Sequence, residues 1–408
     1  MHSKNLLFND PIYGFIAIES DLILQLINHP YFQRLRRISQ MGLSSLVYPG
    51  AHHTRFEHAI GAVHVMQKAI TVLLKKGIVI SKEEQEAMQI AVLLHDIGHG
   101  PFSHVTEKSL LSGVNHEEIS IRVIKLLNEE FNGALVLTLK IFTNDYPREF
   151  MHQLVSGQVD VDRLDYLKRD SFYTGASEGN INSDRIISMM HVDKEQLVFE
   201  SRGVHSLEKF LLARRLMYWQ VYLHKTSLVA ELVLVKVLSH FRKLVESGKE
   251  KIKPSHILFP FFNISKMPSL ENDILNHYLT LDNTEILYLL KSWVNHHDIT
   301  LKTLSRQLIY RKLPKIKIKE KSFAATDIIK KKNRVAYLNL KEDELDYFVF
   351  TGSVSNQMYI SDHTKILLKE KSGKIVPLES LINYLDFKQF SNSVHKYYLC
   401  YPKRENSL

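Results

Sequence analysis

Hydrophobic residues recur every three or four positions along most of the first ~300 residues, which is the spacing of helices with one buried face. After Thr54, for example, Ala59, Ala62, Met66 and Ile70 fall on one side of a helix. The pattern predicts helices at about 21–27, 31–40, 54–76, 83–96, 116–130, 147–170, 183–190 and 204–247, with one or two more within 268–296. The sequence therefore predicts a mainly α fold.

From about residue 313 the hydrophobic pattern changes to alternation, which is typical of β-strands. Strands are predicted at 315–319, 335–340, 347–350 and 365–369, and a short helix at 377–385. A loop rich in Lys, Pro and Phe, at about 248–265, precedes this change. We therefore expect three parts: a helical core at 1–247, a helical extension at 248–300, and a small basic α+β domain at 301–408.

The composition is that of a globular protein with a substantial core. Of 408 residues, 45% are hydrophobic and 24% charged, and no apolar run is long enough to cross a bilayer. The N-terminal residues lack the apolar stretch of a signal peptide, and Cys400 is the single cysteine. These features predict a cytoplasmic protein with no membrane partner.

The net charge of +9 comes from one segment. Between Lys302 and Arg334, twelve basic residues accompany two acidic ones, so the rest of the chain is close to neutral. A solvated surface is our leading interpretation of this segment. The alternative is an anion site for an allosteric nucleotide or for nucleic acid, and nucleic acid is less favoured because no recognised binding module accompanies the charges.

The densest group of chemically active side chains is the run from His95 to His104, His-Asp-Ile-Gly-His-Gly-Pro-Phe-Ser-His. It follows an apolar stretch at 91–94, and a Ser-x-x-Glu pattern at Ser81 predicts the start of the helix that leads into it. Imidazole and carboxylate groups bind divalent metals such as Mn, Fe, Mg, Ni and Zn. The run therefore indicates a metal site.

Two further motifs supply partners for this run. His58 lies at the start of a predicted helix with Arg55 on the same face, and guanidinium groups bind phosphate oxygens well. Asp162, Tyr166 and Asp170 form a polar stripe at intervals of four residues, which indicates the wall of a polar cavity. We predict that the metal ligands are His58, His95, Asp96 and Asp162.

This H…HD…D pattern resembles the HD-domain metal-dependent phosphohydrolases. Further motifs resemble the deoxynucleoside triphosphate (dNTP) triphosphohydrolases within them, above all the sterile-alpha-motif and HD-domain branch and its bacterial relatives. The similarity covers roughly residues 5–245, and its additional motifs are Arg34–Gly42, Tyr48–Ala51, Thr54–His58 and Tyr222–Lys225. The resemblance implies a helical HD-domain core.

The resemblance also implies a reaction, in which metal-activated water attacks the α-phosphorus of a dNTP and releases deoxynucleoside and triphosphate. His104 would be the general acid, supported by His99, His116 and Glu107. Phosphate contacts would come from Arg55, Arg163, Tyr166 and Lys225, and deoxyribose contacts from Gln40, Met41, Asp170 and Tyr222. Tyr222 would crowd the 2′ carbon, and Asp170 and Gln40 would bind the 3′-hydroxyl. Ordinary packing or hydrogen bonding is the alternative role for each.

Asn28, Gln33 and Arg36 match positions at which the eukaryotic relative binds an activating guanine nucleotide. Asn28 replaces an aspartate and Leu6 replaces a lysine, so helix packing is the alternative role of this group. The resemblance also implies a homo-oligomer, either a dimer or a tetramer.

Two other functions fit the same residues. One is hydrolysis of a different phosphoester in a nucleotide or nucleic acid. The other is a nucleotide sensor or nucleic-acid binder that turns over little substrate. The products formed from a dNTP distinguish these functions from the first.

Overall fold

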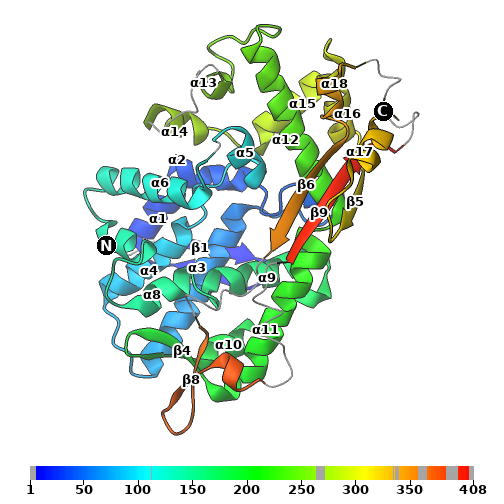
Figure 1. Cartoon of the computed structure of the whole chain (residues 1–408). Helices are drawn as coiled ribbons and strands as arrows, with labels where there is room; N and C mark the ends of the chain where they lie inside the picture. Colours follow the sequence, from blue (N-terminus) through cyan, green and yellow to red (C-terminus); the bar gives the residue numbers. More distant parts are fainter. Residues whose placement is uncertain are drawn as a thin grey trace.

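The structure is a computed structural model, and it describes residues 6–111, 113–262, 272–333, 335, 340–356, 365–382 and 394–403. Helices make up most of it, as predicted (Figure 1). The longer helices are α1 (Asp21–Asn28), α3 (Arg55–Lys75), α4 (Lys82–Leu94), α6 (His116–Glu130), α9 (Val161–Thr174), α11 (Val204–Met217), α12 (Lys225–Glu246), α15 (Asn283–Trp293), α16 (Ile299–Ile309) and α17 (Ala325–Lys332). The shorter ones are α2 (Pro30–Gln33), α5 (His104–Ser109), α7 (Val136–Phe142), α8 (Glu149–Val155), α10 (Ser183–Met189), α13 (Phe259–Phe262), α14 (Asn272–Tyr278) and α18 (Glu342–Leu345).

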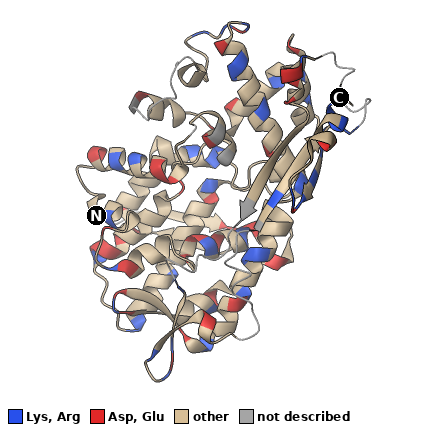
Figure 2. Ribbon diagram, viewed as in Figure 1, with Lys and Arg blue, Asp and Glu red and all other residues tan. Residues whose placement is uncertain are grey.

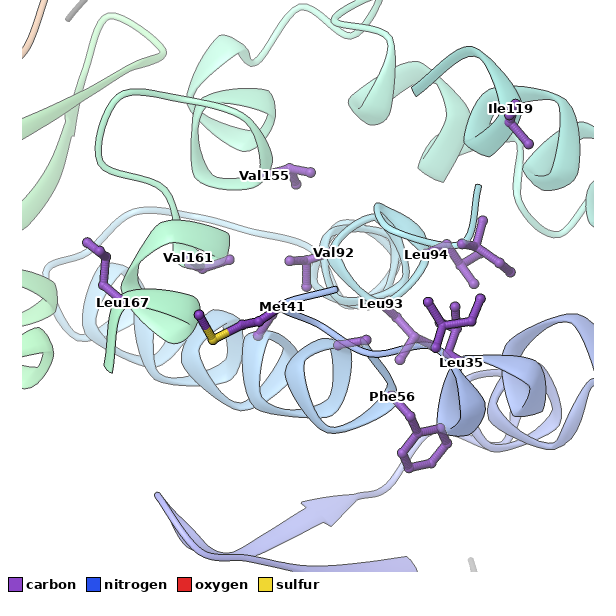
Figure 3. Close-up of a cluster of buried hydrophobic side chains, with 14 of the residues drawn as sticks. Leu35, Met41, Phe56, Val92, Leu93, Leu94, Ile119, Val155, Val161 and Leu167 are labelled. Carbon is purple, nitrogen blue, oxygen red and sulfur yellow. The ribbon is translucent and has the colours of Figure 1, made fainter. Parts of the chain in front are cut away.

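Helix α3 is the centre of the core. Thr54 and Glu57 form a capping box at its start, which satisfies backbone N–H groups that would otherwise be unpaired. Most of its residues are buried, because α4 and α9 pack against it. Figure 3 shows apolar side chains of this core, including Phe56 of α3, Leu93 of α4 and Val161 of α9. Burial of each such side chain stabilises the fold by about 1.5–3 kcal/mol.

Three small sheets accompany the helices. Strands β1 (Leu6–Asp10) and β2 (Gly14–Ile18) form a hairpin. The second sheet has the order β3-β4-β7-β8, and the third is antiparallel with the order β5-β9-β6. Their bounds are β3 Met190–Asp193, β4 Gln196–Glu200, β5 Lys315–Lys319, β6 Phe350–Asn356, β7 Leu367–Lys369, β8 Ile375–Pro377 and β9 Val394–Tyr401. Because β7 pairs with β4, one sheet joins the C-terminal region to the helical core, and the three-part division stays a prediction.

Two predicted long helices are broken in the structure. The helix predicted at 147–170 is wrong, because α8 ends at Val155 and Asp160 caps a new helix by accepting the N–H of Arg163. The helix predicted at 204–247 is also wrong. It is interrupted by a π-helical turn at Tyr218–Tyr222, and the Nδ1 of His224 then accepts the N–H of Thr226 at the start of α12. Polar side chains cap the start of a new helix after each break, although the hydrophobic spacing continues.

Other boundaries differ in detail. The segment predicted as a helix at 31–40 is α2 followed by a 3-10 helix at Arg34–Arg37. A turn follows α18, so the strand predicted at 347–350 begins only at Phe350. The helix predicted at 377–385 is a 3-10 turn at Leu378–Ser380. Residues 336–339 and 383–385 of the predicted elements lie outside the described part of the chain.

The basic segment lies on the surface. Lys315, Lys317 and Lys319 are exposed on β5, while the residues between them turn toward the core. Figure 2 shows the basic residues of β5 and α17 on the right of the view. Across the described ranges, no helix has the length and apolar character needed to span a membrane.

Gly61 of α3 provides the close approach that brings α9 against the core. A Cβ atom there would lie 2.1 Å from the Arg169 guanidinium and 2.2 Å from the Asp165 carboxylate. Both side chains are buried, and they form an ion pair with each other. The small residue therefore creates the space that this ion pair occupies.

We predict that Gly61→Ala lowers the free energy of unfolding by about 3 kcal/mol, because the added methyl group displaces a buried ion pair. Urea denaturation measures the change. Thr71→Ala, at an exposed position of the same helix, is the control and should change it by less than about 0.5 kcal/mol. A Gly61→Ala protein as stable as this control would contradict the prediction.

Candidate functional site

Three predicted metal ligands meet where three helices begin or end. His58 lies in the first turn of α3, His95 caps the end of α4, and Asp162 lies in the first turn of α9. The Nε2 atoms of the two histidines are 3.3 Å apart, and Asp162 Oδ1 lies 3.0 Å from His58 Nε2 and 3.4 Å from His95 Nε2. One ligand atom from each residue lies within 4.8 Å of the others, so the group could hold a metal ion.

The partners of the other ring nitrogens show how these histidines are oriented. His95 Nδ1 lies 2.6 Å from the carbonyl oxygen of Val92, and His58 Nδ1 lies 2.7 Å from Asp165 Oδ2. With a proton on each Nδ1, the neutral imidazoles would carry their lone pairs on the two Nε2 atoms, where a metal ion could bind them. Burial alone would lower the pKa of His58, but hydrogen bonds to Asp162 and Asp165 raise it to about 10. The pocket stabilises positive charge at this point, which fits a bound cation.

A buried ion-pair network lies behind His58. Arg169 donates to both oxygens of Asp165, at 2.9 and 3.0 Å, and to Asp10 Oδ2 at 2.8 Å. Burial would raise the pKa of Asp165, but the Arg169 charge and His58 lower it to about 2. The sequence analysis assigned no role to Asp165, Arg169 or Asp10, although the spacing of four residues between Asp165 and Arg169 is a signal for such a pair.

Asp96, the fourth predicted ligand, lies beside the two histidines. Its Oδ1 is 3.4 Å from His95 Nε2, and its Oδ2 accepts a hydrogen bond from Arg55. Arg55 also donates to Ser103 Oγ at 2.7 Å. Burial would raise the pKa of Asp96, but Arg55 and the adjacent histidines hold it well below its usual range. The group that could hold an ion thus consists of His58, His95 and Asp162, while Asp96 lies beside the two histidines and is bound by Arg55.

The predicted acid–base group forms a second cluster next to Asp96. The His99 and His116 rings stack 3.8 Å apart, and Nδ1 of each lies 3.3 Å from Glu107 Oε1. His99 Nε2 is 3.4 Å from Asp96 Oδ1, and burial together with the Arg55 charge lowers the pKa of His99 to about 4. His104 opens α5, but its side chain lies outside the described part of the structure.

The loop that carries His95 and His99 is held from behind by a buried arginine. Arg34 donates to the carbonyl oxygens of Ile97 and His99, at 2.9 and 2.8 Å, and to that of Leu281 at 3.1 Å. Ser120 of α6 adds a hydrogen bond to the carbonyl oxygen of His95 at 2.8 Å. These bonds fix the backbone around the metal group.

Of the residues predicted around the sugar, Tyr222 contacts Asp170. Tyr222 donates to Asp170 Oδ2 at 2.8 Å, and His53, which the sequence analysis missed, lies 2.6 Å from Asp170 Oδ1. Gln40 has a buried side-chain oxygen with no hydrogen-bond partner in the described structure. Met41 is buried in the hydrophobic core, as Figure 3 shows, and this matches its alternative packing role.

The predicted phosphate contacts are less closely grouped. Arg163 binds Asp160 and the carbonyl oxygen of Gly157, and burial raises the pKa of Tyr166 to about 12 against the positive charges of Arg214 and Arg163. Lys225 lines a separate cavity of about 830 Å³ beside the C-terminal sheet.

Arg214 of α11 was not predicted from the sequence. Its Nε and Nη1 atoms are buried, and they have no hydrogen-bond partner within the described ranges. Its charge acts on both Tyr166 and Asp160, so it lies at the same wall of the site. A pair of adjacent arginines, Arg214 and Arg215, within an ordinary helical pattern gave no sequence signal for this position.

Two of the predicted activator residues, Gln33 and Arg36, are bound to each other. Arg36 Nε donates to Gln33 Oε1 at 2.9 Å, and Gln33 Nε2 donates to the carbonyl oxygen of Ile27 at 2.7 Å. The Arg36 guanidinium lies 3.6 Å from the centre of the Phe56 ring, and Asn28 ends α1. These contacts match the alternative packing role, and guanine-nucleotide activation stays a prediction.

Comparison with protein families matches two models to this chain. The HD domain covers residues 55–170, and the HD associated region covers residues 181–256. The first of these ranges contains all four predicted metal ligands together with Asp170. The second contains Arg214 and Tyr222.

Similar proteins span much of the chain. The crystal structure of a phosphohydrolase from Bacteroides thetaiotaomicron has a TM-score of 0.93 and 45% identity, covering 98% of this chain and 100% of that one. YwfO of Bacillus subtilis, which is uncharacterized, is 35% identical over 76% of this chain and 71% of its own length. The SAMHD1 homolog of Dictyostelium discoideum, named as a deoxynucleoside triphosphate triphosphohydrolase, is 32% identical over 65% of this chain and 56% of its own length. This chain belongs to the HD-domain phosphohydrolase family.

Proposed function

We propose that this protein hydrolyses dNTPs to deoxynucleoside and inorganic triphosphate. One observation carries the proposal, which is the position of Tyr166 between two chemically different ends of the site. Its ring lies 6.4 Å from that of His58 and 6.1 Å from that of Tyr222. The proposed phosphate end and the proposed hydroxyl end of the site would therefore both adjoin one side chain, which suits a nucleotide. The name of the Dictyostelium relative supports the same substrate class.

At the phosphate end, His58, His95, Asp96 and Asp162 would hold a divalent metal ion. When bound, the ion would lower the pKa of a water molecule and polarise the phosphoryl group. Arg214 offers buried N–H groups that have no partner among the described residues, and Arg55 lies against Asp96. These arginines would neutralise phosphate oxygens as negative charge develops on them.

At the sugar end, Asp170 and Gln40 offer acceptors for a hydroxyl group. The Asp170 carboxylate is buried, and the Gln40 side-chain oxygen has no partner in the described structure. Tyr222 is fixed against Asp170, so its ring forms a rigid wall of the pocket. A rigid wall favours a sugar that lacks the 2′-hydroxyl.

The leaving sugar oxygen needs a proton. The stacked pair His99 and His116, linked by Glu107, adjoins Asp96 through His99. His99 is neutral near pH 7, because its pKa is about 4, so it would relay a proton rather than be its source. By resemblance His104 would deliver it. The homo-oligomer and the cytoplasmic location also stay proposals.

We predict that the purified protein with Mn²⁺ converts at least one dNTP, alone or in a mixture of all four, to deoxynucleoside and triphosphate. Ion-pair chromatography separates these products from monophosphate and pyrophosphate. Asp162→Ala, which removes a ligand, should abolish the reaction. If the metal-loaded protein releases no triphosphate from any mixture, the proposed function is wrong. The protein would then act on another phosphoester or sense nucleotides.

We predict that Asp165→Asn weakens Mn²⁺ binding about 10- to 100-fold, because the amide no longer fixes the His58 proton on Nδ1. Competition with a chromophoric chelator measures the affinity. Asp184→Asn is the control, since Asp184 is an exposed partner of Lys68, and it should bind Mn²⁺ like the unmodified protein. Equal affinity in Asp165→Asn and this control would show that the network does not tune the site.

We predict that Arg214→Gln lowers kcat/KM for the dNTP about 100-fold while the metal content stays unchanged, because a buried donor to the phosphates is lost. Steady-state kinetics and elemental analysis measure the two effects. Arg202→Gln serves as the control, because Arg202 is 64% exposed and pairs only with Glu200 among the ion pairs of the described chain. If the two variants lower kcat/KM by the same factor, Arg214 has no specific role.

A further inference from the structure

The Asp170 carboxylate is held by one donor on each oxygen. Tyr222 donates to Oδ2 at 2.8 Å, and His53 Nε2 lies 2.6 Å from Oδ1. The side chains of His53 and Asp170 are 0% and 3% exposed. A buried carboxylate needs such donors because water does not reach it. Each oxygen still keeps a lone pair for a ligand hydroxyl.

The two donors also fix the plane of the carboxylate. Rotation about the last side-chain bond of aspartate is soft, so one hydrogen bond leaves the orientation of the group poorly defined. Bonds to opposite oxygens remove this freedom. Because the Tyr222 hydroxyl is bound to the same carboxylate, His53 also helps to set the position of the Tyr222 ring.

His53 itself is rigidly mounted. Its ring stacks on Tyr173 with centroids 4.3 Å apart and an interplanar angle of 12°. The Tyr173 hydroxyl donates to Glu57 Oε1 at 3.1 Å, which ties it to the capping box of α3. A Cβ atom on Gly50 would lie 2.6 Å from the carbonyl oxygen of Tyr173, so the loop before His53 approaches α9 closely. The Nδ1 atom of His53 is buried, with no hydrogen-bond partner in the described ranges.

We propose that His53 is a positioning residue for sugar recognition, which orients Asp170 and Tyr222 so that the pocket accepts a 3′-hydroxyl and excludes a 2′-hydroxyl. This inference rests on the proposed dNTP hydrolysis. His53 acts through Asp170 and needs no contact with the substrate. Its role is therefore in discrimination and affinity, and the chemical step depends on other residues.

The test compares His53→Leu, which removes the donor, with His53→Gln, whose amide nitrogen can reach Asp170. For His53→Leu we expect the KM for the dNTP to rise about tenfold, and the ratio of kcat/KM for dNTP over the matching ribonucleotide to fall by at least as much. His53→Gln should keep most of the ratio. His52→Leu, at the adjacent exposed residue, is the control and should match the unmodified protein.

Metal content and thermal unfolding are measured for every variant. If His53→Leu does not fold, the comparison of His53→Gln with His53→Asn replaces it, because the shorter Asn amide does not reach Asp170. The proposal is overturned if the variant without the donor keeps the sugar preference and KM of the unmodified protein, or if Gln fails to restore them. Failure of the proposed function looks different, since the unmodified protein itself would then release no triphosphate.

Discussion

The ion pair between Asp165 and Arg169 is the interaction on which the rest of the site depends. Both side chains are buried, and Asp10 supplies a second acceptor to the same guanidinium. Buried charges cost free energy unless they are paired and hydrogen-bonded, and here every charged group has a partner. The pair fixes the proton of His58 on Nδ1, so that Nε2 faces Asp162. It also joins β1, α3 and α9, because Asp10 ends β1 and Gly61 of α3 leaves the space that the pair fills.

The site is assembled at helix ends, where backbone groups need partners from outside the helix. His58 and Asp162 lie in first turns, and His95 lies at a C-terminus. The loop after His95 then depends on Arg34, whose guanidinium is fully buried and binds backbone carbonyl oxygens. Burial lowers the pKa of Arg34 to about 10, despite the attraction of Tyr278 and Asp282. A charged side chain is thus used to hold backbone rather than substrate.

The metal group could be predicted from the sequence because its signals are local. A histidine in a first turn, a His-Asp doublet after an apolar run, and a polar stripe are each visible within about ten residues. The sequence did not show which distant side chains contact these residues or their neighbours. His53 meets Asp170 across 117 positions and Arg169 meets Asp10 across 159, so tertiary packing alone decides these contacts. The breaks before Asp160 and His224 were missed for a related reason, since hydrophobic spacing continues through both although these side chains cap the start of new helices.

Helix α9 carries four carboxylates at the site, and each of them has a partner. Asp160 binds Arg163, Asp162 faces the histidines, Asp165 binds Arg169, and Asp170 binds His53 and Tyr222. Successive residues of a helix point in different directions, so the four carboxylates reach four different sets of partners. Asp162 and Asp170 share one face, and Tyr166 lies between them by spacing. A ligand that touches both must extend along this face, which favours a phosphate joined to a sugar over a free phosphate.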